Sequence, residues 1–75
     1  MIKPADKKSL KKLGEHIASI RQEKKLSLRE VSYACNIDNS KISKIEKGQI
    51  NITFTTMLQL AEALEVSLPE LLKYK

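Results

Sequence analysis

The stretch that most constrains the fold of this chain runs from Ser27 to Gly48, because two short helical patterns follow one another there with only three residues between them. Apolar residues recur at helical spacing over residues 28–35 and again over residues 39–47. Two short helices joined by so tight a turn are typical of a helix-turn-helix. The stretch therefore favours a layout in which the second helix buries two isoleucines and presents its other face outward.

Local signals place the starts and ends of the helices. Ser27 with Glu30, and Ser67 with Glu70, are capping boxes, in which the serine and glutamate side chains bond each other's backbone amides. Asn36 tolerates the left-handed backbone that ends a helix and turns the chain. No segment has the alternation of a strand, so the predicted fold class is all-α. The five expected helices cover residues 9–24, 28–35, 39–47, 54–64 and 68–73.

Each expected helix has one apolar face, and these faces together make the expected core. The single cysteine, Cys35, lies on an inner face and is expected to be a small core residue rather than a reactive thiol. The only histidine, His16, is expected to be solvated. One cysteine and one histidine are too few for a structural zinc site, so neither a metal nor another cofactor is expected. On the fourth helix the apolar face comprises Phe54, Met57, Leu58, Leu60, Ala61 and Leu64.

Charge is distributed unevenly, which bears on the kind of partner. The 75 residues carry 14 Lys and Arg against 9 Asp and Glu, a net charge of +5 that favours an anionic partner, either nucleic acid or a membrane surface. Residues 1–48 hold twelve of the bases and six of the acids, so the excess lies there. Five lysines lie within residues 3–12, but such a run is commonly a solvated tail and decides nothing alone.

Length and hydropathy limit the organisation of the chain. We expect a basic N-terminal extension over residues 1–9 and a single domain over residues 10–75. No apolar run approaches the length of a membrane span and no signal peptide opens the chain, so we expect a cytoplasmic protein that does not bind membranes.

The outer face of the third expected helix is polar and acid-poor. The face comprises Asn39, Ser40, Lys41, Ser43, Lys44 and Lys47, with Glu46 as the only acid of that helix. Amide, hydroxyl and ammonium groups suit the edges of bases in the major groove, which admits one α-helix. An ordinary polar surface helix can have the same composition, so the residues alone leave both interpretations open.

The chain also resembles the lambda-repressor-like helix-turn-helix family, called the Cro/cI or XRE type, in register over about residues 10–73. Ile42-Ser43-Lys44-Ile45-Glu46-Lys47-Gly48 resembles the most recognisable stretch of the family, and residues 57–68 resemble its fourth helix and the turn that follows. The resemblance implies a compact five-helix DNA-binding domain. It also implies a transcriptional regulator, not an enzyme, that binds double-stranded DNA at a pseudo-palindromic operator as a homodimer.

The resemblance further implies roles for individual residues. Arg21 and Glu46 match an internal ion pair that ties the first helix to the third. Leu28 stands where many members have a phosphate-binding glutamine, so that side-chain contact is lost and Arg29 could supply another. The positions that match base contacts are Asn39, Ser40 and Lys44. The positions at or beside phosphate contacts are Leu28, Arg29, Lys41, Ser43 and Lys47.

Some residues depart from the family pattern. Lys25, Asn36 and Glu65 stand where the family often has glycine, so the backbone at Glu65 is expected to be strained or differently capped. Ser32 replaces a buried alanine, and its hydroxyl needs a local partner, for which a carbonyl one turn back is the candidate.

The apolar C-terminus and the function leave alternatives open. Leu71, Leu72 and Tyr74 exceed what a short fifth helix can bury and are expected to form a dimer seam, whereas the alternative is a tail folded back on the first helix. One alternative function is an antitoxin that represses its own operon and also binds a toxin. Another is a protein-interaction module, with an unknown partner, that keeps the fold without binding DNA.

Overall fold

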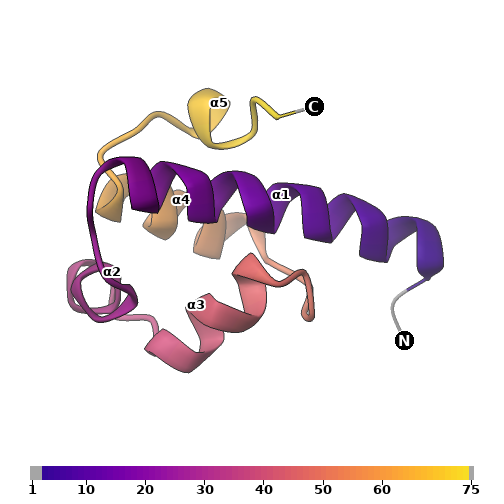
Figure 1. Ribbon diagram of the computed structural model, residues 1–75, viewed down its shortest axis with the longest axis horizontal. Coiled ribbons are helices and arrows are strands. Elements are labelled where there is room, and N and C mark those ends of the chain that lie inside the picture. The colour runs from indigo at the N-terminus through magenta and orange to yellow at the C-terminus, as the bar shows by residue number, and fades with distance from the viewer. Residues whose placement is uncertain (1–2, 75) are drawn as a thin grey trace.

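The computed structural model describes residues 3–74, and the described residues form five helices and no strand. The predicted all-α fold class and number of helices are confirmed. Helix α1 lies along the long axis, with α2 and α3 on one side of it, α5 on the other and α4 behind (Figure 1). None of the described helices is both long and apolar enough to cross a membrane. The helices are α1 (Pro4–Glu23), α2 (Leu28–Cys35), α3 (Asn39–Glu46), α4 (Phe54–Ala63) and α5 (Leu68–Leu71).

The predicted caps hold the helix starts. At α2 the amide of Glu30 donates to Ser27 Oγ at 3.0 Å, and the amide of Ser27 donates to the Glu30 carboxylate at 3.0 Å. The same reciprocal pair is present between Ser67 and Glu70 at the start of α5. Helix α2 ends at Asn36, whose φ of 58° is left-handed as expected. Local sequence signals therefore determine where these two helices begin and where α2 turns into α3.

Helix α1 begins at Pro4, about one and a half turns before the expected start. The expected start followed the apolar stripe, which opens at Leu10, and the preceding turn has no core to contact. Proline is nevertheless favoured at the first helical position, alanine and lysine are good helix formers, and the amide of Lys7 donates to the Lys3 carbonyl at 2.9 Å. The other helix bounds agree with expectation within two residues. Met1 and Ile2 of the expected extension, and Lys75 at the end of the expected domain, lie outside the described residues.

The buried core draws on all five helices and includes Cys35, as predicted. Phe54 and Leu58 were expected in it, but they are 59% and 42% exposed. They lie one turn apart on α4, on a row that turns away from the core, and Thr56 takes an inner position instead. The hydroxyl of Thr53 donates to that of Thr56 at 2.8 Å, which satisfies this buried polar group. The core comprises Leu13, Ile17, Val31, Cys35, Ile37, Ile42, Ile45, Leu60, Ala61, Leu64 and Leu71.

The C-terminal end folds back on α1. His16 is half-buried, with Nε2 2.9 Å from the Glu70 carbonyl oxygen and its ring centroid 6.0 Å from that of Tyr74. The expectation of a solvated His16 is therefore wrong, because α5 covers that side of α1. Leu71 was assigned to a dimer seam, but it is fully buried because the single turn of α5 directs it into the core. Of that group only Leu72 and Tyr74 remain on the surface, at 40% and 37% exposed.

Candidate nucleic-acid interface

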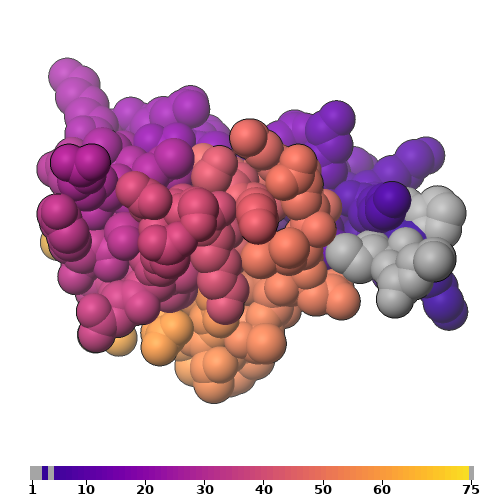
Figure 2. Space-filling model, turned by 90° about the horizontal axis from the view of Figure 1, so that it is seen from below, coloured from indigo at the N-terminus to yellow at the C-terminus, as the bar shows by residue number. Residues whose placement is uncertain are grey.

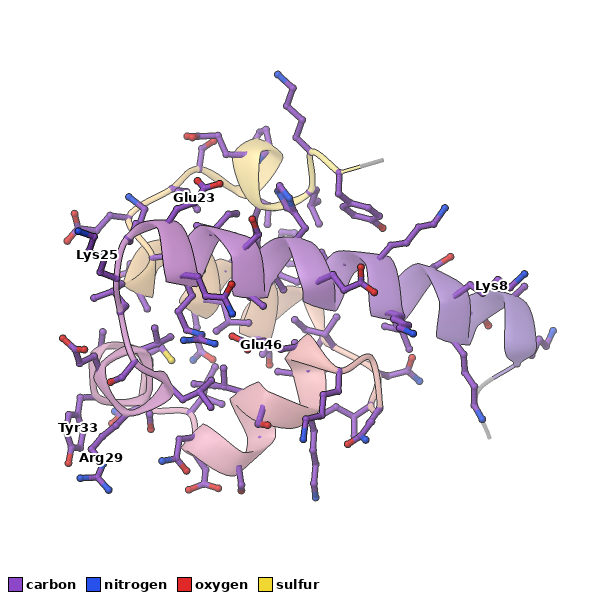
Figure 3. The ribbon with its side chains drawn as sticks, in the orientation of Figure 1. Lys8, Glu23, Lys25, Arg29, Tyr33 and Glu46 are labelled. Atoms are coloured by element: carbon purple, nitrogen blue, oxygen red, sulfur yellow. The ribbon has the colours of Figure 1, made fainter. Side chains whose placement is uncertain are left out.

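An ion pair between α1 and α3 sets the position of the third helix. Arg21 Nε donates to Glu46 Oε2 at 2.7 Å and Nη2 donates to Oε1 at 3.0 Å, so the pair is bidentate. The remaining nitrogen, Nη1, donates to the Leu26 carbonyl at 2.9 Å and thereby fixes the turn before α2 as well. The hydrogen bonds that Arg21 donates to the Glu46 carboxylate raise the pKa of Arg21 above its ordinary value. The pair lies between the two helices, where Figure 3 labels Glu46.

Two glycines let α1 and the end of α3 approach closely. A Cβ at Gly14 would lie 2.3 Å from the Ile45 carbonyl oxygen, so no other residue fits without moving the backbone. Gly48 has a φ of 70°, and a Cβ there would lie 2.6 Å from Lys11 Cα. The sequence led us to expect no close approach of helices at either glycine. An isolated glycine within a helical pattern was the available signal for such an approach.

The turn between α2 and α3 is tied from within. Ser32 Oγ donates to the Ile37 carbonyl, which lies forward in the turn rather than one helical turn back as expected. Ile37 itself is buried in the core. Asp38 occupies the N-cap position of α3, but its carboxylate accepts a hydrogen bond from the Ser40 hydroxyl instead of from a helix amide. The angle between α2 and α3 is thus held by the turn and by the core beneath it.

The outer surface of α3 is exposed, polar and basic. Asn39, Ser40, Lys41 and Lys44 are all exposed, and Ser43 is half-buried at the edge of the surface. Glu46, the only acid of the helix, turns inward to Arg21 and leaves no carboxylate of α3 on this surface. Figure 2 views this face and shows α3 at its centre, between α2 and the loop that follows α3. The three residues expected to contact bases therefore lie together on one face of one helix.

The start of α2 lies beside this surface. Leu28 is half-buried and packs against the core, so its side chain is not free to contact a phosphate. Arg29 is exposed, and Figure 3 shows it with Tyr33 projecting from α2 away from the body. The amides of Leu28 and Arg29 are in the first turn, whose N–H groups have no partner within a helix. The start of α2 thus presents two amides and a guanidinium.

The other expected residues divide between this face and the far side of α1. Lys47 is exposed just after α3 and adjoins the basic surface. Leu72 and Tyr74 follow α5, which lies across α1 from α3 (Figure 1). A polar face and an apolar C-terminus are therefore separated by the body of the domain.

Comparison with known proteins identifies the family. A family model described as helix-turn-helix matches residues 17–71. The chain belongs to the XRE-type, lambda-repressor-like helix-turn-helix family. It is 38% identical over 61 residues to the uncharacterized HTH-type transcriptional regulator y4dJ of Sinorhizobium fredii, a match that covers 81% of this chain and 79% of that protein.

Two solved structures of controller proteins have the same fold as this helix-turn-helix chain. The restriction-modification controller protein C.AhdI of Aeromonas hydrophila matches with a TM-score of 0.83 and 31% identity, over 85% of this chain and 97% of that one. The controller protein C.Esp1396I, a tetramer in complex with its natural 35 base-pair operator, matches with a TM-score of 0.74 and 32% identity, over 85% and 95%. The chain is a helix-turn-helix transcriptional regulator similar to these controller proteins, and the similar proteins are regulators rather than enzymes.

Proposed function

We propose that this regulator binds a pseudo-palindromic operator in double-stranded DNA as a homodimer, with α3 of each copy in the major groove. The observation that carries the proposal is the outer surface of α3, where amide, hydroxyl and ammonium groups are exposed and the only acid of the helix is turned inward. The similar protein C.Esp1396I in complex with its operator supports it. A regulator of this kind works where the DNA is, so we place it in the cytoplasm.

The side chains divide into those that select a sequence and those that hold the backbone. We assign base contacts to Asn39, Ser40 and Lys44, which share one exposed face of α3. Phosphate contacts are assigned to the first amides of α2, at Leu28 and Arg29, because helix starts favour anions. The side chains assigned to phosphates or to bases at the edge of the site are the exposed Arg29, Lys41 and Lys47 and the half-buried Ser43.

A dimer is proposed because a single recognition helix gives a small interface, about 600–1,000 Å² of buried protein surface. We place the seam at Leu72 and Tyr74, the two exposed apolar side chains that follow α5. Two such domains related by two-fold symmetry would bind half-sites about 34 Å apart, one turn of DNA.

In vitro selection from random duplex DNA tests the proposal directly. We expect enrichment of a sequence with two inverted half-sites whose centres are about 10 base pairs apart. Binding to the selected duplex should weaken steeply as salt rises, because phosphate contacts release counterions. Failure to enrich any sequence, together with no salt-dependent binding to duplex DNA, would overturn the proposal.

Two lysine variants test the division of roles on α3. Lys44→Ala should change the preference at one base position by about 1–3 kcal/mol, because Lys44 is assigned to a base edge. Lys47→Ala should weaken binding to all sequences alike, because Lys47 is assigned to phosphate. Affinities for the selected operator and its single-base variants measure both effects. Identical behaviour of the two variants on every duplex would show that the assignment is wrong.

Two leucine variants test the seam. Leu72 and Leu58 are similarly exposed, at 40% and 42%, but Leu58 lies on α4 whereas Leu72 follows α5. Leu72→Glu should shift the protein from dimer to monomer in sedimentation, because two carboxylates would meet at the two-fold axis. Leu58→Glu serves as the matched control and should leave the dimer intact. The reverse result would move the seam to α4.

A further inference from the structure

We propose that Lys3, Lys7 and Lys11 form a second phosphate-binding surface, which contacts DNA beyond the stretch bound by α3. This inference rests on the proposed function and extends it to the flanks of the operator. The three lysines lie on the start of α1, a segment that has no part in the core and no role in reading bases.

The first observation is that these lysines are held on a helix. Because α1 begins at Pro4, Lys7 and Lys11 lie one turn apart on a single row, and Lys3 caps that row. All three are exposed. Among residues 3–74 the ion pair observed is that of Arg21 with Glu46, so none of these ammonium groups forms an ion pair with a described carboxylate. A helix fixes the spacing of the charges, which a solvated tail would not do.

The second observation is where this row lies. Gly48, directly after Lys47, packs so closely on α1 that a Cβ there would lie 2.6 Å from Lys11 Cα and Lys11 N. The lysine row therefore meets the end of the α3 surface and continues its positive charge. Figure 2, which views the α3 face, also shows the start of α1 beside the loop after α3.

The third observation concerns the length of the lysine row. Lys3, at the N-cap, and Lys11 are eight positions apart in the sequence, or about 12 Å at the rise of a helix. Phosphates on one strand follow each other by about 3.4 Å along the DNA axis, so the row is long enough to face more than one of them. Figure 1 shows that α1 extends past the end of α3, which carries the row outside the width of the recognition helix. The chemical partner that fits a straight row of ammonium groups beside a DNA-binding face is the phosphate backbone of the same duplex.

The same helix supplies a matched control. Lys8 and Lys12 are also exposed and also one turn apart, but they lie about 100° around the helix from the row, away from Gly48. Lys8 is labelled in Figure 3 on the part of α1 that extends past α3. Replacing either pair by glutamine changes the net charge from +5 to +3 and keeps a good helix former at each site.

The experiment compares Lys7→Gln/Lys11→Gln with Lys8→Gln/Lys12→Gln on two duplexes. One duplex carries the selected operator with about 10 flanking base pairs, one helical turn, on each side, and the other ends at the operator. Circular dichroism checks that each variant keeps its helix content. Affinities are measured across a range of salt concentrations, because each lost phosphate contact lowers the salt slope by about 0.9.

We expect Lys7→Gln/Lys11→Gln to bind the long duplex on the order of 10-fold more weakly, with a slope smaller by about 1.8 per protein subunit. The variant should match the wild type on the short duplex, and Lys8→Gln/Lys12→Gln should change little on either. Two outcomes would overturn the inference: equal effects of the two double variants, or weaker binding of Lys7→Gln/Lys11→Gln to the short duplex as well. In both cases the wild type would still bind its operator, so the proposed function would stand. No binding by the wild type to either duplex would overturn the proposed function and this inference together.

Discussion

Helix α1 is joined to α3 and to α5 by two different kinds of contact. The α1–α3 junction has backbone against backbone at Gly14, and a bidentate ion pair with side chains only 14% and 10% exposed. The α1–α5 junction depends on one hydrogen bond from half-buried His16, a tilted ring contact and the single buried Leu71. Helix α3, which is proposed to bind DNA, is therefore fixed by contacts that allow little adjustment. Helix α5, beside the proposed seam, is held by a few weaker side-chain contacts.

The largest effect is expected at the α1–α3 junction. Arg21→Met removes one partner of the ion pair, leaves the Glu46 carboxylate without its partner and frees the Leu26 carbonyl. Breaking such a pair costs about 3–5 kcal/mol, so the midpoint of urea unfolding should fall sharply. The double variant Arg21→Met/Glu46→Leu removes both charges and should recover most of the loss. A single variant as stable as the wild type would show that Gly14 and the core hold the junction without the pair.

A smaller effect is expected at the α1–α5 junction. His16→Ala removes the bond to the Glu70 carbonyl and the contact with Tyr74, which together are worth about 1 kcal/mol. Hydrogen exchange of the α5 amides should become faster while that of α3 stays unchanged. His16→Gln, which can still donate to the carbonyl, should lose less. Faster exchange in α3 as well would mean that the two junctions are coupled.

The smallest effect is expected from the two capping boxes, one at the start of α2 and one at the start of α5. Hydrogen bonds from the serine amide, and then from its hydroxyl, lower the pKa of both Glu30 and Glu70. A lowered pKa in the folded state means that stability is present above the unfolded pKa of about 4.3 and is lost as pH falls through the folded value. Thermal unfolding between pH 6 and pH 3 should therefore show a decline that Glu30→Gln or Glu70→Gln makes shallower. Glu62→Gln, outside both boxes, should leave the profile unchanged.

Much of the fold could be predicted because its signals are local. A serine three residues before a glutamate, or an asparagine after an apolar run, acts through its own backbone, and the structure has these features where the sequence predicts them. The exceptions are decided by tertiary contacts. Phe54 and Leu58 are apolar, but they lie on a row of α4 that faces away from the core. That Leu71 points inward is shown only by the packing of α5.

The residues of the candidate site could be predicted from the sequence, but their contacts with distant parts of the chain could not be predicted from local signals. The polar character of α3 follows from its sequence, and the pairing of Glu46 with Arg21, 25 positions earlier in the chain, was expected only from the resemblance to the family. His16 was misjudged because no local signal indicates its partner, the Glu70 carbonyl, which lies 54 positions away. The sequence did not place the lysines at the start of α1 relative to α3. The structure places them, because α1 begins at Pro4 and Gly48 packs against Lys11.

The three left-handed residues, Lys25, Asn36 and Glu65, each with a φ of 58°, also bear on how long a copy of the regulator survives. A non-glycine residue in this conformation costs about 1 kcal/mol or more, somewhat less for asparagine. A domain of this length has a total stability of only about 4–11 kcal/mol, so the three sites consume a sizeable share. Cellular proteases remove the unfolded fraction, which grows as stability falls. The strain at these three positions thus enlarges the unfolded fraction, which is the fraction that proteases remove.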